Sequence, residues 1–485
     1  MQNRNGFLNY NDTDNSSRFY EQEEPKMAMK EVPISSTNDL QAKPVRNATF
    51  SICKALAIIC VVLSHSGGPS WLLNIVFQFH VPVFLICAGY FFNAKYLNDE
   101  KTYIANRIKG LYFPFVRWSI FFLVFHNLWF YLGILNEQYG NAGGGVTHPY
   151  NFSQFSQRLW SIVFNMSGYD EFLAGAFWFF RALFIGSIAF LLLYKICVWL
   201  LIKNGKEPSK LFIGGIIFVI SLLMSTWLIL ANLKITGISQ GGYREIMVVC
   251  FMAIGYIFRQ IIDNKLFNKI QKERFGTILK ICLPSFLLLI FGSIFFPSSM
   301  TYRPDFWGSI SLPFTGFAGF LLLYFFSIWL QKQENILKQL LIYIGDNTLY
   351  IFAFHLLAFK LVSIFKVVIL NLPWKMVGGH PIVIEGSGHD FFWLIYLLVG
   401  ICAPLVWIWV YRKLEYKLGF TLAYDNLLNQ KVINLVFSNA FNGLYFITFK
   451  SLHLLRALCM SVWHFFSNLV QGIKDIIKAS SPEDE

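Results

Sequence analysis

The stretch "KALAIICVVLSHS", Lys54–Ser66, opens the first strongly apolar part of the chain. Most of its residues suit hydrocarbon, and its length suits part of a membrane-spanning helix, which needs about 20 mainly apolar residues. Two residues do not suit hydrocarbon: Lys54 near the start and His65 near the end. Because ionisable groups in a span are costly, they usually have a partner or a function. The stretch therefore predicts a spanning helix and marks these two side chains as candidates for function.

The composition extends this interpretation to the whole chain. The 485 residues are 55% hydrophobic, 18% aromatic and 14% charged, with a mean hydropathy of +0.51. Soluble domains carry about 25% charged residues. The sequence therefore predicts an all-α integral membrane protein. The eight cysteines are scattered in apolar runs without metal-ligand spacing, so no metal is expected.

About ten apolar segments are long enough to span a membrane. They lie near residues 49–66, 71–92, 111–135, 174–202, 211–231, 244–262, 279–297, 309–330, 345–370 and 391–411.

The loops between these segments alternate in charge. One set of loops is rich in Lys and Arg, whereas the opposite set holds only Arg158, Lys234, Arg244, Arg303, Lys366 and Lys375. Cytoplasmic loops carry the excess of Lys and Arg in membrane proteins. The pattern predicts that both termini are cytoplasmic. It also explains the net charge of +13 without nucleic acid, which we do not expect as a partner.

Three regions follow from this division. Residues 1–48 are polar and are expected to form a disordered cytoplasmic tail. Residues 49–412 form the predicted ten-helix membrane domain. Residues 413–485 contain apolar residues at helical spacing interrupted by basic ones, which indicates an amphipathic helical region on the cytoplasmic membrane surface. Two long loops on the opposite side, about 136–173 and 371–390, either cover a site or only connect helices.

Lys54 and His65 share one face of the first helix. Eleven residues at about 100° each come to three turns plus about 20°, and they separate the two side chains by about 16 Å along the axis. A cation at the cytoplasmic edge and a base deeper in the membrane would suit a molecule threaded along the helix, such as the phosphopantetheine arm of coenzyme A. The alternative is that Lys54 only anchors the helix end and that His65 faces water.

Other polar residues could complete such a site. Arg107 and Lys109 precede the third span and could bind phosphates, although ordinary cytoplasmic loop charge explains them too. His80 lies near the outer end of the second span, where it could approach His65 or be a satisfied interface histidine. Pro82 is expected to make this span irregular. Arg181 lies among aromatic residues at the start of the fourth span, where a buried partner is expected.

A structural or a catalytic role is open for three further residues: Arg244 and Glu245 at the start of the sixth span, and His355 within the ninth. For each of them an ion pair or a hydrogen bond between helices explains the residue at least as well as catalysis does.

The order of the motifs resembles the acyltransferase 3 family of bacterial membrane O-acyltransferases. The motifs are "VVLSH", "FHVPVFLICAGYFF", "RIKGLYFPF", "FWFFRALFI" and "IGDNTLYIFAFH", and the resemblance runs from about Phe50 to Arg412. It implies a ten-helix core in the bacterial inner membrane that takes an acyl group from cytoplasmic acetyl-CoA. The acceptor is a hydroxyl of a cell-surface glycan or of its lipid-linked precursor.

The resemblance also implies roles for residues. His65 matches the essential histidine of the family, and Lys54 stands where the family often has arginine. Arg107 matches the first arginine of an RxxR pattern, and Gly110 stands at the second. Cys87 replaces the usual serine of the second helix.

We therefore expect an O-acyltransferase, most simply an O-acetyltransferase. His65 would be the general base, since an imidazole pKa near about 6.5 suits that task. His80 and Arg181 are the candidate oxyanion donors. Lys54, Arg107 and Lys109 would hold the phosphates of acyl-CoA, which is a substrate rather than a permanently bound cofactor. Direct transfer and an acyl-histidine intermediate both remain open.

The expected partners are acyl-CoA, a glycan or glycolipid acceptor and membrane lipids. Two other classes of protein stay open. A transporter or flippase of lipid-linked sugars would also be basic with many spans, but would not need a cation and a base aligned on one helix. A membrane glycan polymerase or ligase would favour large outer loops rich in arginine.

Overall fold

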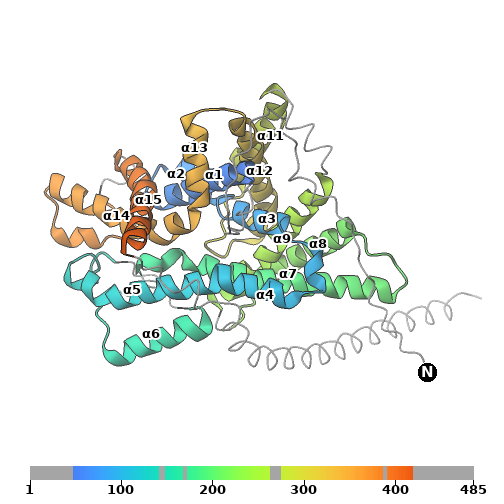
Figure 1. Ribbon diagram of the computed structural model, residues 1–485, viewed down its shortest axis with the longest axis horizontal. Coiled ribbons are helices and arrows are strands. Elements are labelled where there is room, and N and C mark those ends of the chain that lie inside the picture. Colours follow the sequence, from blue (N-terminus) through green and yellow to red (C-terminus); the bar gives the residue numbers. More distant parts are fainter. Residues whose placement is uncertain are drawn as a thin grey trace, which may run out of the picture. The chain divides into compact units, whose positions relative to one another are not determined.

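The computed structural model describes residues 47–140, 148–167, 172–236, 238–262, 275–385 and 390–418. Within these ranges the chain forms helices and no strand (Figure 1). Ten helical segments are long and apolar enough to cross a membrane, as predicted. The protein is therefore an all-α, multi-pass membrane protein. Residues 1–46 of the predicted tail and the part of the C-terminal region beyond Leu418 lie outside the described residues. The predicted boundaries at 48 and 413 shift slightly, because α1 begins at Ala48 and α15 runs to Leu418.

The spanning segments match the predicted ranges except the third, which begins at Glu100 rather than near 111 and so includes Arg107 and Lys109. They are α1 (Ala48–His65), α2 (Ser70–Phe77) with α3 (Pro82–Tyr90), α4 (Glu100–Arg107) with α5 (Phe113–Tyr131), α7 (Trp178–Lys203), α8 (Lys210–Leu230), α9 (Tyr243–Ile261), α11 (Phe275–Phe295), α12 (Phe306–Gln331), α14 (Thr348–Ile369) and α15 (Phe392–Leu418).

Two connections contain helices that hydropathy did not single out. The long loop after the third span contains α6 (Phe152–Asn165), whose Asn151 and Gln154 form a capping box. The connection after α12 contains α13 (Ile336–Asp346). The predicted ninth span therefore begins too early, because its first residues belong to α13. Asn347, whose backbone is not helical and whose side-chain amide donates to the carbonyl of Tyr343 at 2.8 Å, separates α13 from α14.

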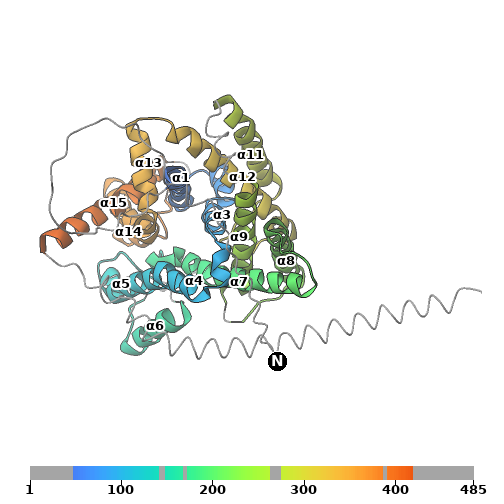
Figure 2. The ribbon, with the colours of Figure 1, turned by 45° about the vertical axis from the view of Figure 1, so that its right-hand side comes forward.

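Helix α1 lies inside the bundle. It packs against α3, α12, α13, α14 and α15, and Figure 2 shows α12, α13 and α14 arranged around it. Its N-cap residue Asn47 accepts a hydrogen bond from the backbone N–H of Phe50 at 3.4 Å. A Cβ added at Gly345 of α13 would collide with the carbonyl of Ser51, so the two backbones lie close together. The helix that bears Lys54 and His65 is thus held on several sides.

The second span is discontinuous. It breaks between Phe77 and Pro82, where proline supplies the first turn of α3 without needing a hydrogen-bond partner for a backbone N–H. Broken helices are tolerated at membrane depth where other protein groups satisfy the freed polar atoms. Here Gln78 lies in the break and its amide donates to the carbonyls of Asn74 and Leu289 at 3.2 and 3.3 Å. The irregularity expected at Pro82 is confirmed.

The third span also contains an irregular turn. A single π-helical turn, Ile108–Tyr112, joins α4 to α5. Such turns are often found at functional sites. This one carries Lys109 and Gly110, in the segment already singled out for binding phosphates.

Glycines let α3 and α9 approach at backbone distance. A Cβ at Gly89 of α3 would collide with the backbone of Met252, and a Cβ at Gly255 of α9 would collide with the carbonyl of Ile86. Small residues are used in this way where membrane helices pack tightly. The contact fixes α3, and hence the break next to it, against the bundle.

The first prediction concerns this contact. Replacing Gly255 by alanine forces α3 and α9 apart, and overpacking of this kind costs about 1–3 kcal/mol. We expect a lower melting temperature of the detergent-purified protein. Gly215→Ala in α8 is the matched control, because nothing lies within 4 Å of a Cβ there. Equal melting temperatures for the two variants would contradict the close packing.

Candidate functional site

Two histidines from different helices meet at the end of α1. His65 is the last residue of α1, and His355 lies in the third turn of α14. Their ring centroids are 5.3 Å apart, with the planes tilted by 35°. His355 is fully buried, whereas His65 is half-buried. The packing of α1 against α14 therefore brings the predicted base next to a second imidazole.

The tautomer of His355 follows from its hydrogen bonds. Its Nδ1 lies 3.1 Å from the carbonyl oxygen of Ile351 and 2.9 Å from that of Phe352. Because a carbonyl oxygen only accepts, Nδ1 carries the proton and donates. The Nε2 atom is then a lone-pair acceptor, and it is buried with no hydrogen-bond partner among the described residues. His355 thus presents an unused proton acceptor inside the protein, on the ring that faces His65.

The tautomer of His80 is fixed in the same way, by a hydrogen bond to a backbone carbonyl. It lies at the break in the second span, deeper than the span end where the sequence placed it, and it is only 2% exposed. Its Nδ1 lies 2.8 Å from the carbonyl oxygen of Val76, so Nδ1 donates. His80 is close enough to His65 for electrostatic interaction, as expected. In this tautomer Nε2 accepts, so His80 can donate to an oxyanion through Nε2 only when it is protonated.

A fourth histidine comes from the loop between α14 and α15. His380 interacts electrostatically with His65, His355 and Lys360. Its Nε2 lies 3.9 Å from the position that a Cβ would take at Gly175, in the 3-10 turn Phe172–Phe177 before α7. Burial, together with these neighbouring groups, lowers the pKa of His380 to about 3. His380 is therefore neutral near pH 7.

Sequence reasoning missed His380 and Lys360. Lys360 is a lysine within the apolar α14, only 2% exposed. A cation inside an apolar span was the signal that could have found it. His380 left only a weak signal, a polar residue in a Gly-rich loop, because a tertiary contact brings it to His65.

Lys54 and His65 do share one face of a single helix, as predicted. Lys54 is half-buried in the second turn of α1. Between the two residues, Ile58 and Val61 occupy the same face and are 1% and 4% exposed. They belong to an apolar cluster that includes Ile351 of α14. The face that joins the cation to the base is therefore covered by protein.

Arg107 and Lys109 lie at the junction of α4 and the π-helical turn. The Arg107 guanidinium lies over the ring of Tyr103 at 4.8 Å, and its Nε is buried without a hydrogen-bond partner in the described ranges. The Tyr103 hydroxyl donates to the carbonyl of Ser187 in α7 at 3.2 Å. Lys109 and Gly110 are exposed, and a Cβ at Gly110 would meet nothing within 4 Å. This turn has free space next to its cations.

Arg181 belongs to a second polar group. It interacts electrostatically with Glu245 of α9, which also interacts with Arg244. Arg244 is held by the carbonyls of Met300 and Thr301 and stacks on Trp178 at 4.0 Å. The expected partner of Arg181 is thus Glu245. Arg181 Nε is still buried with no hydrogen-bond partner in the part of the chain that the structure describes, so its role as an oxyanion donor stays a prediction.

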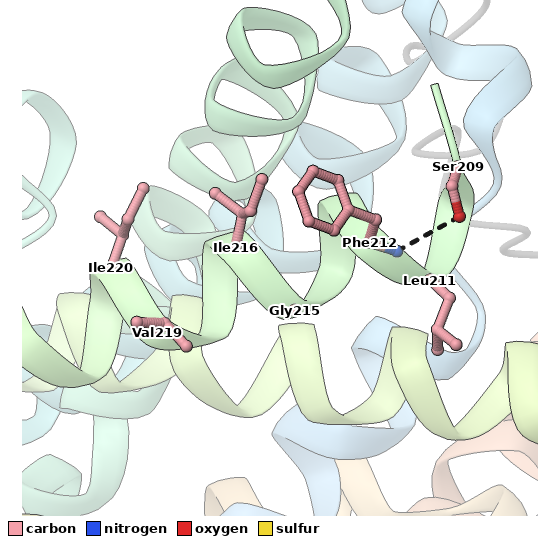
Figure 3. Close-up of a pocket in the computed structure, with 7 residues that line it drawn as sticks. All are labelled: Ser209, Leu211, Phe212, Gly215, Ile216, Val219 and Ile220. Atoms are coloured by element: carbon pink, nitrogen blue, oxygen red, sulfur yellow. Dashed lines mark hydrogen bonds between the residues drawn. The ribbon is translucent and has the colours of Figure 1, made fainter. Parts of the chain in front are cut away.

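A groove elsewhere in the described part of the chain does not share this chemistry. Figure 3 shows an open groove along α8, lined by Ser209, Leu211, Phe212, Gly215, Ile216, Val219 and Ile220. Its exposed apolar side chains suit contact with lipid. Among the residues that the structure describes, no group of three or more His, Cys, Asp or Glu side chains could hold a metal ion. The histidine group is therefore the candidate for chemistry.

A comparison with protein families decides the class of the chain. Residues 47–413 match the model of the acyltransferase 3 family, described as an acyltransferase domain. The chain belongs to this family. No curated protein and no solved structure matches it. The resemblance seen in the motifs is confirmed, and the protein is a membrane acyltransferase.

The second prediction tests the surroundings of Arg181. Arg181→Met leaves the Glu245 carboxylate short of one cation, whereas Arg181→Met with Glu245→Gln removes both charges. If the two side chains form a pair, their coupling in a double-mutant cycle should be about 0.5–3 kcal/mol. Melting temperatures in detergent of the wild type, Arg181→Met, Glu245→Gln and the double variant measure this coupling. Strictly additive shifts would show that Glu245 is not the partner of Arg181.

Proposed function

We propose that the protein moves an acetyl group from cytoplasmic acetyl-CoA to a hydroxyl of a cell-surface glycan or of its lipid-linked precursor, in the bacterial inner membrane. The observation that supports this most is the histidine group at the end of α1. In this group the imidazole of His65 lies beside the ring of His355, whose Nε2 is an acceptor, and His65 is at the opposite end of α1 from Lys54.

In the proposed reaction His65 acts as general base. It takes the proton of the acceptor hydroxyl while the hydroxyl oxygen attacks the thioester carbonyl carbon. The C–S bond then breaks, the coenzyme A thiolate leaves, and His65 returns the proton to it. A positioned base of this kind contributes about 10²–10⁴-fold. The imidazole of His380, neutral near pH 7, keeps the surroundings of His65 polar without adding a second charge.

The developing oxyanion needs a hydrogen-bond donor. Arg181 has an unused Nε donor, although its guanidinium also faces Glu245. His80 offers a donor only after protonation. Arg181 supports this role by a donor that needs no protonation, and His80 supports it by its interaction with His65.

The donor would bind at the other end of α1. Successive spans alternate in direction, so Arg107 and Lys109 at the start of the third span lie on the same side as the start of α1. Lys54, Arg107 and Lys109 would hold the phosphates of coenzyme A. Charge complementarity favours this side for the donor, and the excess of Lys and Arg in its loops favours a cytoplasmic location.

The covered face of α1 constrains the path of the pantetheine arm. Because Ile58 and Val61 are packed against α14, the arm must pass beside this face or α1 and α14 must separate. The axial span of about 16 Å from Lys54 to His65 still matches an extended arm.

The third prediction tests His65. His65→Ala should reduce acetyl transfer from acetyl-CoA by about 10²–10⁴-fold, because the base is lost, while the melting temperature stays near that of the wild type. Transfer is measured as base-labile radiolabel in envelope material of isolated membranes. His148→Ala, in an exposed loop position, is the control and should keep full activity. Full transfer by His65→Ala would refute the assigned base.

The fourth prediction tests the donor site. Gly110→Arg adds a cation in open space at the position of the second arginine of the family pattern. An exposed ion contact is worth up to about 1 kcal/mol, so the KM for acetyl-CoA should fall about threefold to fivefold.

Gly110→Gln is the control for this test, since it adds a side chain of similar length without charge. If both variants show the same KM, the turn does not face the donor phosphates.

A further inference from the structure

The loop between α14 and α15 is fastened to α14 by buried lysines. Lys360 is 2% exposed, and its ammonium donates to the carbonyl oxygens of Val377 and Gly379 at 3.0 and 2.7 Å. These two carbonyls lie just before His380 in the chain. The ammonium therefore fixes the backbone that leads into this histidine.

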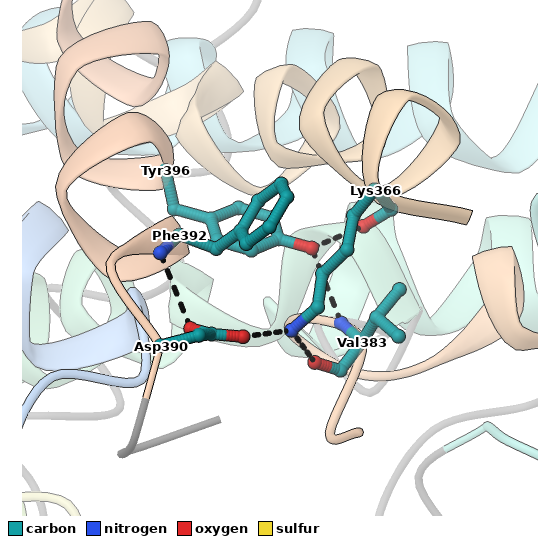
Figure 4. A network of polar contacts seen from close by, with 6 residues as sticks. Lys366, Val383, Asp390, Phe392 and Tyr396 are labelled. Carbon is teal, nitrogen blue, oxygen red and sulfur yellow. Dashed lines mark hydrogen bonds and ion pairs between the residues drawn. The ribbon is translucent and has the colours of Figure 1, made fainter. Parts of the chain in front are cut away.

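A second anchor holds the same loop after His380. Lys366 is fully buried, donates to the carbonyl of Val383 at 3.4 Å and pairs with Asp390 at 2.6 Å (Figure 4). The hydroxyl of Tyr396 in α15 accepts from the backbone N–H of Val383 at 3.3 Å. His380 thus lies on a short segment held at both sides.

Because this segment is held on both sides, the side chain of His380 lies at the site. Its imidazole lies next to the turn at Gly175 and within electrostatic reach of His65 and His355. The three histidines come from α1, from α14 and from the loop. Hydrogen bonds from Lys360 and Lys366 hold the loop against α14 on either side of His380.

Both anchors are buried cations of α14. Lys366 has the carboxylate of Asp390 as counter-ion, and Lys360 donates to the two carbonyls given above. An ammonium inside a span is expensive and usually serves a function. The carbonyls compensate part of that cost through charge-assisted hydrogen bonds, and what they secure is the backbone on which His380 is carried.

We propose that His380 binds the acceptor hydroxyl beside His65, and that Lys360 is a positioning residue which holds His380 there. The proposal rests on the proposed acyl transfer. It assigns the acceptor subsite of that reaction to the loop that follows α14. The acceptor it predicts is an alcohol, such as a sugar hydroxyl, that approaches from the loop side. His380, neutral at pH 7, can donate to or accept from that hydroxyl without adding charge.

The experiment separates the two fates of the thioester. Membranes containing the full-length protein are supplied with radiolabelled acetyl-CoA. Hydrolysis is followed as free acetate, and transfer as base-labile label on envelope polymers. His380→Ala should lower the ratio of transfer to hydrolysis at least tenfold, because the acceptor hydroxyl loses a partner whereas water can still enter.

Lys360→Met should cause a similar fall in this ratio, since it releases His380. The double variant should show little further loss, which an unrelated structural role of Lys360 would not produce. Lys375→Met, an exposed lysine of the same loop, is the control and should match the wild type. If Lys360→Met does not accumulate, His380→Gln takes its place and should retain more transfer than His380→Ala, because an amide also donates and accepts.

The outcomes distinguish this proposal from the one it rests on. An unchanged ratio in His380→Ala, with an active wild type and an inactive His65→Ala, would overturn the acceptor subsite alone. Multiplying losses in the double variant would overturn the positioning role of Lys360. A wild type that neither hydrolyses acetyl-CoA nor transfers acetyl would overturn both proposals.

Discussion

A buried imidazole in an apolar span must find a hydrogen-bond acceptor for its N–H, and in this protein the preceding turn of the same span supplies it. His80 donates to the carbonyl of Val76 and His355 to that of Ile351, each four residues earlier. The arrangement satisfies the N–H without a second polar residue in hydrocarbon, where an unsatisfied group is costly. It also fixes the tautomer, so both rings present Nε2 as an acceptor. The chemistry near His65 depends on this constraint.

The sequence predicted the membrane domain well because hydropathy and length reflect a single strong constraint. A span must be apolar over about 20 residues, and all ten predicted segments are found. The shared face of Lys54 and His65 followed from helix geometry alone, as did the interruption near Pro82. These features are local, so one segment of sequence determines each of them.

Features that depend on contacts between distant segments could not be predicted. His380 joins the site through a loop that Lys360 and Lys366 hold against α14. The burial of Ile58 and Val61 depends on α14, and the partner of Arg181 depends on α9. Helix α13 was hidden within a connection because its eleven residues are too few to span and are separated from α14 by the non-helical Asn347. A single sequence does not show which helices are neighbours.

The placement of charge in the protein follows one physical logic. Phosphates are bound best by permanent cations, and the cations of the proposed donor site lie in the second turn of α1 and around the π-helical turn. A base must stay neutral to accept a proton, and the histidines lie where hydrocarbon and the packed helices disfavour charge. The deeply buried cations of α14 are each matched by carbonyls or by Asp390. A chain that placed a free ammonium beside His65 would raise the cost of forming an imidazolium there, because two cations would face each other at low dielectric. The proposed proton transfer therefore favours keeping ammonium groups away from His65. The ammonium of Lys360, which interacts electrostatically with His380, points at backbone carbonyls of the loop.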